Sequence, residues 1–131
     1  MNGYKHRIVV PFQDTDMAGV VHYTKLLGYV EQAEHAALES VDVPVISSKG
    51  GFPKVHIECD YRAPVRFGDE VDVVITLREI SDKSLHWGYL LELGGRSLAG
   101  GTMVTAMVDI EGKPKVIPLD YRDKLRLLCK E

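Results

Sequence analysis

The sequence has 131 residues, of which 45% are hydrophobic and 27% are charged, and its net charge is −3. A chain of this size suits one domain with its own core, so we expect a single domain over residues 1–131. The slightly acidic balance argues against nucleic acid as a partner, because phosphate binding requires a basic surface. No segment approaches the roughly 20 apolar residues that span a bilayer, so no membrane span is expected.

The two cysteines, Cys59 and Cys129, lie far apart and have no partner at a zinc-binding spacing. Residues 1–7 are polar and lack the apolar stretch of a secretory signal. Unpaired thiols are typical of a reducing compartment. We therefore expect a cytoplasmic protein with two free thiols.

The first elements in chain order are a short strand and a polar turn. Residues 6–12 alternate apolar and polar side chains, which predicts a strand with Ile8, Val10 and Phe12 on one side. The stretch Asp-Thr-Asp-Met-Ala-Gly-Val-Val-His-Tyr follows at residues 14–23. Its acids and its glycine are typical of a tight turn, yet one acid is enough for a turn. Two acids, a glycine and an aromatic pair are also compatible with a turn that has a chemical role.

A long amphipathic helix is predicted from residue 24 to residue 41. Apolar residues recur there at helical spacing along one face, and polar residues fill much of the remainder. The apolar face consists of Leu26, Leu27, Val30, Ala33, Ala37 and Val41. Glu31 and Glu34 are assigned to the polar side. Pro44 and the glycine pair at 50–51 end the helix.

From Pro53 onward the hydrophobic period changes to two, which predicts successive strands joined by short turns. In the first of these strands, Val55 and Tyr61 belong to the apolar face and Lys54 to the polar face. Gly100-Gly101 indicates a bulge or a close approach of the backbone to a ligand within the last strand. The predicted strands cover residues 55–61, 71–77, 85–93 and 98–110, with a tight hairpin at 111–113 and a final helix over 119–129.

This order of elements favours an α+β fold. Strands joined by such short turns must pair antiparallel, and one long helix needs an apolar surface to cover. We therefore predict an antiparallel sheet of five to six strands wrapped around one long central helix. The sheet keeps open edges, so we expect a homo-oligomer, with a C2 dimer formed by edge-to-edge pairing as the minimum and a tetramer of two dimers above it.

Three segments together resemble the hot-dog-fold acyl-CoA thioesterases, in particular the 4-hydroxybenzoyl-CoA thioesterase-like group. The first is FQDTDMAGVVHY at residues 12–23, in which an aromatic residue precedes Asp-x-Asp, a glycine, two aliphatic residues and an aromatic or His pair. The second is YRAPVRFGDEVDV at 61–73, and the third is GGTMVTAMVDIEGKPKVIP at 100–118. The segments occur in register over nearly the whole chain. The resemblance implies a hot-dog fold and an acyl-CoA substrate that is hydrolysed to a carboxylate and free CoA.

The resemblance also implies roles for individual residues. Asp16, the second acid of the motif, would be the catalytic carboxylate and would act as nucleophile or general base. The backbone N–H of Tyr23, at the start of the helix, would bind the thioester oxyanion, which suits the positive end of a helix dipole. Gly19 would let the chain bend between them. Coenzyme A would be part of the substrate, and neither a metal nor another cofactor is expected.

Alternatives stand beside these roles. Asp16 could serve only as an Asx-turn or N-cap residue, and Asp14 is expected to build the turn that aims Asp16. His22 precedes Tyr23, whereas many relatives have the reverse order. A role for the His22 side chain in orienting substrate, or in setting the protonation of Asp16, therefore competes with that of a polar residue at the helix start. Glu31 is the rival catalytic carboxylate, because some hot-dog enzymes use an acid on the helix; otherwise it is a solvated or interface residue.

Two other functions are compatible with the sequence. A hot-dog dehydratase or isomerase acting on acyl thioesters would need a His and an acid at a longer spacing, and it would release no free thiol. A non-catalytic acyl-CoA-binding protein would keep the fold and would not depend on Asp16. Arg62, Arg66 and Arg96 are candidates for contacts with the CoA phosphates. The sequence does not specify the acyl group.

Overall fold

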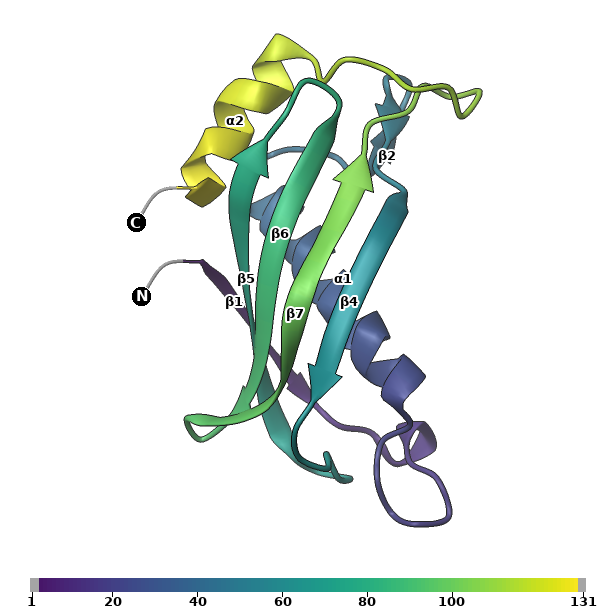
Figure 1. Cartoon of the computed structure of the whole chain (residues 1–131), viewed down its shortest axis with the longest axis vertical. Coiled ribbons are helices and arrows are strands. Elements are labelled where there is room, and N and C mark those ends of the chain that lie inside the picture. The colour runs from purple at the N-terminus through teal and green to yellow at the C-terminus, as the bar shows by residue number, and fades with distance from the viewer. Residues whose placement is uncertain (1–2, 130–131) are drawn as a thin grey trace.

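The computed structural model describes residues 3–129, which form a sheet of five antiparallel strands, a two-stranded ribbon and two α-helices (Figure 1). The strands are β1 (Tyr4–Val9), β2 (Ile46–Ser47), β3 (Gly50–Gly51), β4 (Lys54–Tyr61), β5 (Glu70–Ile80), β6 (Ser84–Leu93) and β7 (Arg96–Ala106). The helices are α1 (Tyr23–Ser40) and α2 (Leu119–Cys129), and a short 3-10 turn, η1 (Phe12–Asp14), precedes α1. The large sheet has the order β1-β5-β6-β7-β4. The predicted α+β architecture is confirmed.

Helix α1 crosses one face of the sheet, and α2 packs against β5 at one end of it (Figure 1). The bounds of α1 differ by one residue at each end from the predicted range of 24–41. The face of α1 that packs on the sheet is almost fully buried. This face includes Leu26, Val30, Ala33 and Ala37 as predicted. Among the residues that the structure describes, no helix is long and apolar enough to cross a membrane.

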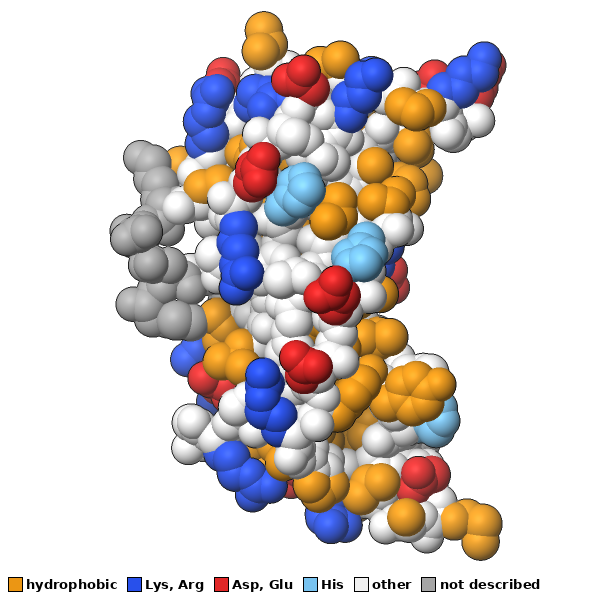
Figure 2. Space-filling view, in the orientation of Figure 1, with side chains coloured by type: hydrophobic (Ala, Val, Ile, Leu, Met, Phe, Trp, Pro, Cys, Tyr) orange, Lys and Arg blue, Asp and Glu red, His pale blue; other side chains and the backbone are white. Residues whose placement is uncertain are grey.

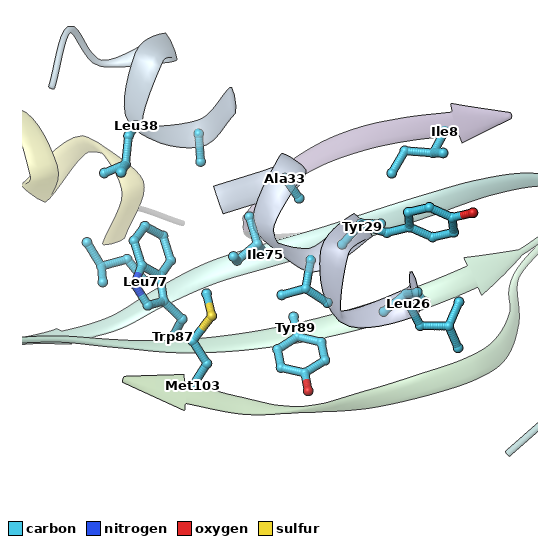
Figure 3. Packing of buried hydrophobic residues seen from close by; sticks show 14 of the residues in the cluster. Ile8, Leu26, Tyr29, Ala33, Leu38, Ile75, Leu77, Trp87, Tyr89 and Met103 are labelled. Atoms are coloured by element: carbon cyan, nitrogen blue, oxygen red, sulfur yellow. The ribbon is translucent and has the colours of Figure 1, made fainter. Parts of the chain in front are cut away.

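The hydrophobic core lies between α1 and the face of the sheet that it covers (Figure 3). Trp87 of β6, Met103 of β7 and Ala33 of α1 belong to this cluster, and all three are almost fully buried. Burial of each large apolar side chain contributes roughly 1.5–3 kcal/mol to stability. The indole Nε1–H of Trp87 donates to Oγ1 of buried Thr105 at 3.2 Å, so this polar pair costs little inside the core.

The first strand ends earlier than predicted. β1 stops at Val9, and Pro11 leads into the 3-10 turn η1 instead of continuing the strand. Phe12 is therefore not buried with the alternate residues of the strand but is 74% exposed. Its ring packs edge-on against Phe67, with the ring centroids 5.7 Å apart. The prediction for Phe12 is wrong because the period of the strand does not continue through Pro11.

A β-bulge reverses the predicted facing at the start of β4. The pairing with β7 shifts by one residue between Lys54 and His56, which leaves Val55 as the extra residue. Val55 is 61% exposed, whereas the ammonium group of Lys54 meets the buried Glu34 on α1. Tyr61, at the other end of this edge strand, is 45% exposed. The predictions of a buried Val55, a buried Tyr61 and a solvated Lys54 are therefore wrong.

The last predicted strand, residues 98–110, is shorter in the structure. β7 ends at Ala106, and Val108 keeps only isolated bridges to Gly51 and Pro114. The carboxylate of Asp109 accepts hydrogen bonds from the N–H groups of residues 111 and 113 at 2.9 and 3.0 Å. These bonds confirm the predicted tight turn at 111–113.

Gly101 marks a close backbone approach and no bulge. Its pairing with Cys59 on one side and with Tyr89 on the other continues without a register shift. A Cβ atom at this position would collide with the carbonyl oxygen of Glu58, which also accepts a hydrogen bond from the Tyr89 hydroxyl. The group that approaches the glycine belongs to the neighbouring strand.

Candidate active site

The turn between η1 and α1 carries the Asp-x-Asp motif in a closed loop. Thr15 and Val21 form an isolated bridge at its neck. Inside the loop, the N–H of Asp16 donates to the carbonyl of Val20 and the N–H of Gly19 donates to the carbonyl of Asp16, both at 2.9 Å. Gly19 has a φ of +79°, where a side chain would strain the backbone. Gly19 therefore allows the bend that holds Asp16 against the residues leading into α1.

The carboxylate of Asp16 uses one oxygen in the turn and presents the other to solvent. Oδ1 accepts hydrogen bonds from the N–H groups of Ala18 at 2.8 Å and Val20 at 3.4 Å. Within the described part of the chain, Oδ2 has no hydrogen-bond or ion-pair partner, and the side chain is exposed. The Asx-turn role is thus present, and it leaves one carboxylate oxygen able to reach water or substrate.

His22 caps the start of α1. Its Nδ1 accepts a hydrogen bond from the N–H of Thr24 at 3.3 Å and lies 2.8 Å from the Oγ1 of the same residue. An accepting Nδ1 places the proton of a neutral ring on Nε2. The ring stacks on that of Tyr23, with centroids 4.6 Å apart and planes inclined by 30°. This geometry gives His22 the structural role of an N-cap, with its ring directed to Thr24 and Tyr23.

The N–H of Tyr23 is left free at the helix start. The N–H of Lys25 donates to the carbonyl of His22 at 2.9 Å, and that of Thr24 donates to the His22 ring. Among residues 3–129 the N–H of Tyr23 has no acceptor. The first turn of a helix carries a partial positive charge that favours anions. Tyr23 therefore offers an unused donor where an oxyanion would be stabilised.

A hollow of about 310 Å³ opens beside Tyr23, between the motif turn, α1 and the end of β4. Its walls are mainly apolar and include Val20, Leu26 and Val65. The hydroxyl of Tyr61 donates to the carbonyl of Tyr23 at 3.4 Å, and the two rings meet edge to face with centroids 6.0 Å apart. Tyr61 is thus a wall of the candidate site.

Asp14 is tied to α1. The hydroxyl of Tyr29 donates to Oδ2 of Asp14 at 2.6 Å, and the backbone carbonyl of Asp14 accepts from the N–H of His22 at 3.4 Å. Burial of the phenol, followed by its bond to the Asp14 carboxylate, raises the pKa of Tyr29, so the hydroxyl stays a donor. These contacts connect the segment just before Asp16 to the helix one and a half turns beyond Tyr23. Asp14 therefore makes the positioning contacts that a turn-building residue requires.

Glu31 and Glu34 share one cation on the β4 side of α1. The ammonium group of Lys54 lies 3.2 Å from Oε2 of Glu31 and 2.6 Å from Oε1 of Glu34. The Glu31 side chain is 53% exposed, whereas that of Glu34 is 1% exposed. Burial raises the pKa of Glu34, although the Lys54 ammonium opposes this shift. The assignment of Glu34 to the polar side of the helix is therefore wrong.

A second, more apolar hollow of about 560 Å³ lies beside Glu31. Ile46, Phe52 and Ile110 contribute to its apolar walls, and Glu31 and His35 contribute polar groups from α1. Ile46 and Ile110 are 78% and 75% exposed, so the hollow is open to one side. Its size suits a ring system or a short acyl chain.

Of the arginines singled out for phosphate binding, Arg62 lines the hollow beside Tyr23. Nη1 of Arg62 donates to Oγ of Ser97 at 3.2 Å and lies over Gly100, on the face of the sheet away from α1. Arg66 pairs by its backbone with Val20, and Arg96 begins β7. Within residues 3–129, no group of three or more His, Cys, Asp or Glu side chains is arranged to hold a metal ion.

Comparison with known proteins identifies the family. Residues 10–125 match the model of the thioesterase-like superfamily. The chain belongs to this superfamily. A 1,4-dihydroxy-2-naphthoyl-CoA hydrolase from Synechococcus sp. (strain CC9605) is 30% identical over an alignment of 124 positions, which covers 88% of this chain and 83% of that protein.

Solved thioesterases have the same fold. The gentisyl-coenzyme A thioesterase BH1999 is 30% identical, with a TM-score of 0.85 over 92% of this chain and 98% of the other. A thioesterase from Thermus thermophilus, in complex with coenzyme A and Zn, is 29% identical, with a TM-score of 0.85 over 98% of each chain. The protein is thus a thioester hydrolase with the hot-dog fold, as its sequence motifs predicted.

The candidate site contains residues that the sequence did not reveal. Tyr29, Tyr61 and Lys54 act through contacts between distant segments, and local patterns carry no signal for such contacts. Glu34 did leave a signal, because it lies four residues after Val30 and so continues the buried stripe of the helix. An acid on that stripe indicates a buried partner, since an unpaired charge is costly there.

Proposed function

We propose that this thioesterase hydrolyses an acyl-CoA to a carboxylate and free CoA, with Asp16 as the catalytic carboxylate and the N–H of Tyr23 as the oxyanion donor. One observation carries the proposal: within the described residues, a carboxylate oxygen without a partner belongs to the turn that leads into a helix whose first N–H is also unused. A thioester carbonyl gathers negative charge during attack, and a fixed donor at that oxygen stabilises the transition state.

Two routes use the same groups. As a general base, Asp16 removes a proton from water, the water oxygen bonds to the acyl carbon, and the C–S bond breaks as the thiolate leaves and is protonated. As a nucleophile, Asp16 forms a mixed anhydride with release of the thiolate, and water then hydrolyses the anhydride. Both routes consume one water and need no metal or bound redox cofactor. A chelator is therefore expected to leave the rate unchanged.

The site is completed by a second copy of the chain in our proposal. Figure 2 shows hydrophobic side chains along the side of the molecule where β4 lies, and Val55 and Tyr61 of this edge strand are exposed. β4 and α1 run in opposite directions, so that Tyr61 meets Tyr23 while Lys54 meets Glu31. Antiparallel pairing of two β4 edges about a two-fold axis brings the Tyr61 end of one strand to the Lys54 end of the other.

This pairing brings the Tyr23 end of one protomer next to the 560 Å³ hollow of its partner. The oxyanion donor of one protomer then faces the 560 Å³ hollow of its partner, which becomes the acyl chamber. The dimer is the minimal active unit in this proposal, and a tetramer of two dimers is the larger assembly. Because Cys59 and Cys129 are both free thiols, we also propose a cytoplasmic location.

The relatives favour an aromatic acyl group that carries hydroxyls. Both the naphthoyl-CoA hydrolase and the gentisyl-CoA thioesterase are named for such substrates. The apolar walls and polar edge of the second hollow suit the same class. We therefore place hydroxyaryl-CoA thioesters ahead of aliphatic ones.

A thiol-release assay tests the proposed reaction. Short, medium and long aliphatic acyl-CoAs are compared with benzoyl-CoA and hydroxybenzoyl-CoAs, using the natural chain, Asp16→Asn and the control Asp123→Asn. Asp123 is an exposed acid on α2 that bonds only to Arg126 among the described residues. The proposal requires thiol release that Asp16→Asn abolishes and the control retains. Binding without thiol release would favour an acyl-CoA-binding protein, and altered acyl groups without thiol release would favour a dehydratase or isomerase.

A further inference from the structure

Lys54 is turned away from solvent by the bulge in β4. In an unbroken strand it would share a face with the outward-pointing His56, but the extra residue Val55 rotates it toward α1. Its side chain is only 23% exposed, and its ammonium group bonds to two carboxylates of the helix. An irregular backbone that delivers a charged group to a half-buried position indicates a specific use of that charge.

Glu34 binds the ammonium group of Lys54 on the buried side of α1. Its carboxylate is almost fully buried and accepts a hydrogen bond from the lysine at 2.6 Å. Burying one acid beside one cation satisfies both charges, so a purely structural pair needs no third member. The structure nevertheless adds Glu31 at 3.2 Å from the same ammonium group.

Glu31 is the member of this cluster that faces a hollow. Half of its side chain is exposed, and it lines the 560 Å³ hollow together with His35. With Lys54 protonated and both carboxylates ionised, the cluster carries one net negative charge. That charge resides on the outer carboxylate, which can accept a hydrogen bond from a donor in the hollow.

We propose that Lys54 is a positioning residue, anchored by Glu34, that fixes the Glu31 carboxylate at the wall of the acyl chamber and thereby selects acyl groups that carry a hydrogen-bond donor. The inference rests on the proposed function, because it takes the second hollow to be the acyl chamber. A ring bearing a hydroxyl satisfies the fixed carboxylate, whereas an unsubstituted ring desolvates it without replacing the lost hydrogen bond. Discrimination of this kind exceeds what an apolar wall can achieve.

The test is a ratio of kcat/KM values for two substrates that differ by one hydroxyl. Benzoyl-CoA is compared with the best of the 2-, 3- and 4-hydroxybenzoyl-CoAs, and the ratio for the natural chain is expected to be about tenfold to hundredfold in favour of the hydroxylated one. Lys54→Met is expected to bring the ratio to within about threefold of unity, and Lys54→Arg to restore most of it. Lys83→Met removes an exposed lysine of the β5–β6 turn and is expected to leave the ratio unchanged.

Glu31→Gln is a second variant that tests the same ratio of kcat/KM values if Lys54→Met does not fold. It leaves the Glu34–Lys54 bond in place and replaces only the charged acceptor, so the ratio should again fall toward unity. A ratio that stays as high as in the natural chain in Lys54→Met or in Glu31→Gln overturns the inference while the proposed reaction stands. If the natural chain releases no thiol from any acyl-CoA, the proposed function fails, and the inference fails with it.

Discussion

Asp16 and Glu34 are two carboxylates of the same chain that are held in opposite ways. Asp16 is exposed, and its hydrogen bonds come from backbone N–H groups of its own turn. Glu34 is buried, and it depends on the ammonium group of Lys54, which reaches it from another strand. Backbone donors hold an acid in place while one of its oxygens stays open. A buried ion pair fixes an acid and removes it from chemistry.

The largest effect is expected at Asp16, for which we propose the catalytic role. Asp16→Asn keeps the hydrogen bonds of the turn and removes the charge, so kcat should fall by about a thousandfold or more while KM changes little. Steady-state thiol release measures both quantities. If substitution of Glu31 lowered kcat as strongly, Glu31 would be the catalytic acid instead. A fully active Asp16→Asn variant would contradict the mechanism.

The largest effect on stability is expected at the buried pair. Lys54→Met leaves the Glu34 carboxylate without its cation and should lower the free energy of unfolding by about 3 kcal/mol near neutral pH. Urea unfolding followed by circular dichroism measures this change. Lys83→Met is the matched control and should lie within about 0.5 kcal/mol of the natural chain.

The loss of stability in Lys54→Met should also depend on pH. Burial raises the pKa of Glu34 in the folded state, so the folded protein binds this proton more tightly than the unfolded chain does. The contribution of the neutral acid to stability is therefore present at low pH and is lost as the pH rises through the raised pKa. Removal of the Lys54 ammonium raises the pKa of Glu34 further. His35 still lowers that pKa, and Glu31 still raises it. The difference in free energy of unfolding between the natural chain and Lys54→Met should therefore become smaller as the pH is lowered from 7.5 to 5. A difference that grows on acidification would contradict this prediction.

A smaller effect is expected where α1 holds the turn that carries Asp16. Tyr29→Phe removes the hydrogen bond to Asp14 and should lower kcat about tenfold, with a loss of about 1–2 kcal/mol in stability. Asp14→Asn should have a similar effect on kcat, and the double variant should be no slower than the worse single one, because both changes remove one contact. Additive losses in this double-mutant cycle would mean that the two residues act separately.

The smallest effect is expected at the cap of α1. His22→Ala should cost about 0.5–1 kcal/mol in stability, and His22→Ser should recover most of it, because serine also caps a helix well. Thermal unfolding measures both variants. If His22→Ser keeps its stability but loses activity as Asp16→Asn does, the His22 ring has a chemical role after all.

The same contrast explains what could be predicted from the sequence. The helix and the strands in the second half of the chain follow hydrophobic periods, and Asp16, Gly19 and Tyr23 lie in one short motif, so these features are local. The reversal at Lys54 depends on one extra residue in β4, which an alternating pattern does not reveal. The bond between Tyr29 and Asp14 joins a helix to a preceding turn, and it depends on how α1 lies over β1 rather than on spacing alone.

Gly101 has a consequence for maps of mutational tolerance. Every other side chain would meet the carbonyl oxygen of Glu58 at this position, so a saturation scan should find no acceptable replacement there. Tyr89 adds a second constraint, because its hydroxyl reaches the same carbonyl across the glycine. In such a scan Gly101 would be as intolerant as a catalytic residue, although the cause is the close approach of a backbone carbonyl. Only an assay that separates the amount of folded protein from the rate per folded molecule would distinguish it from Asp16.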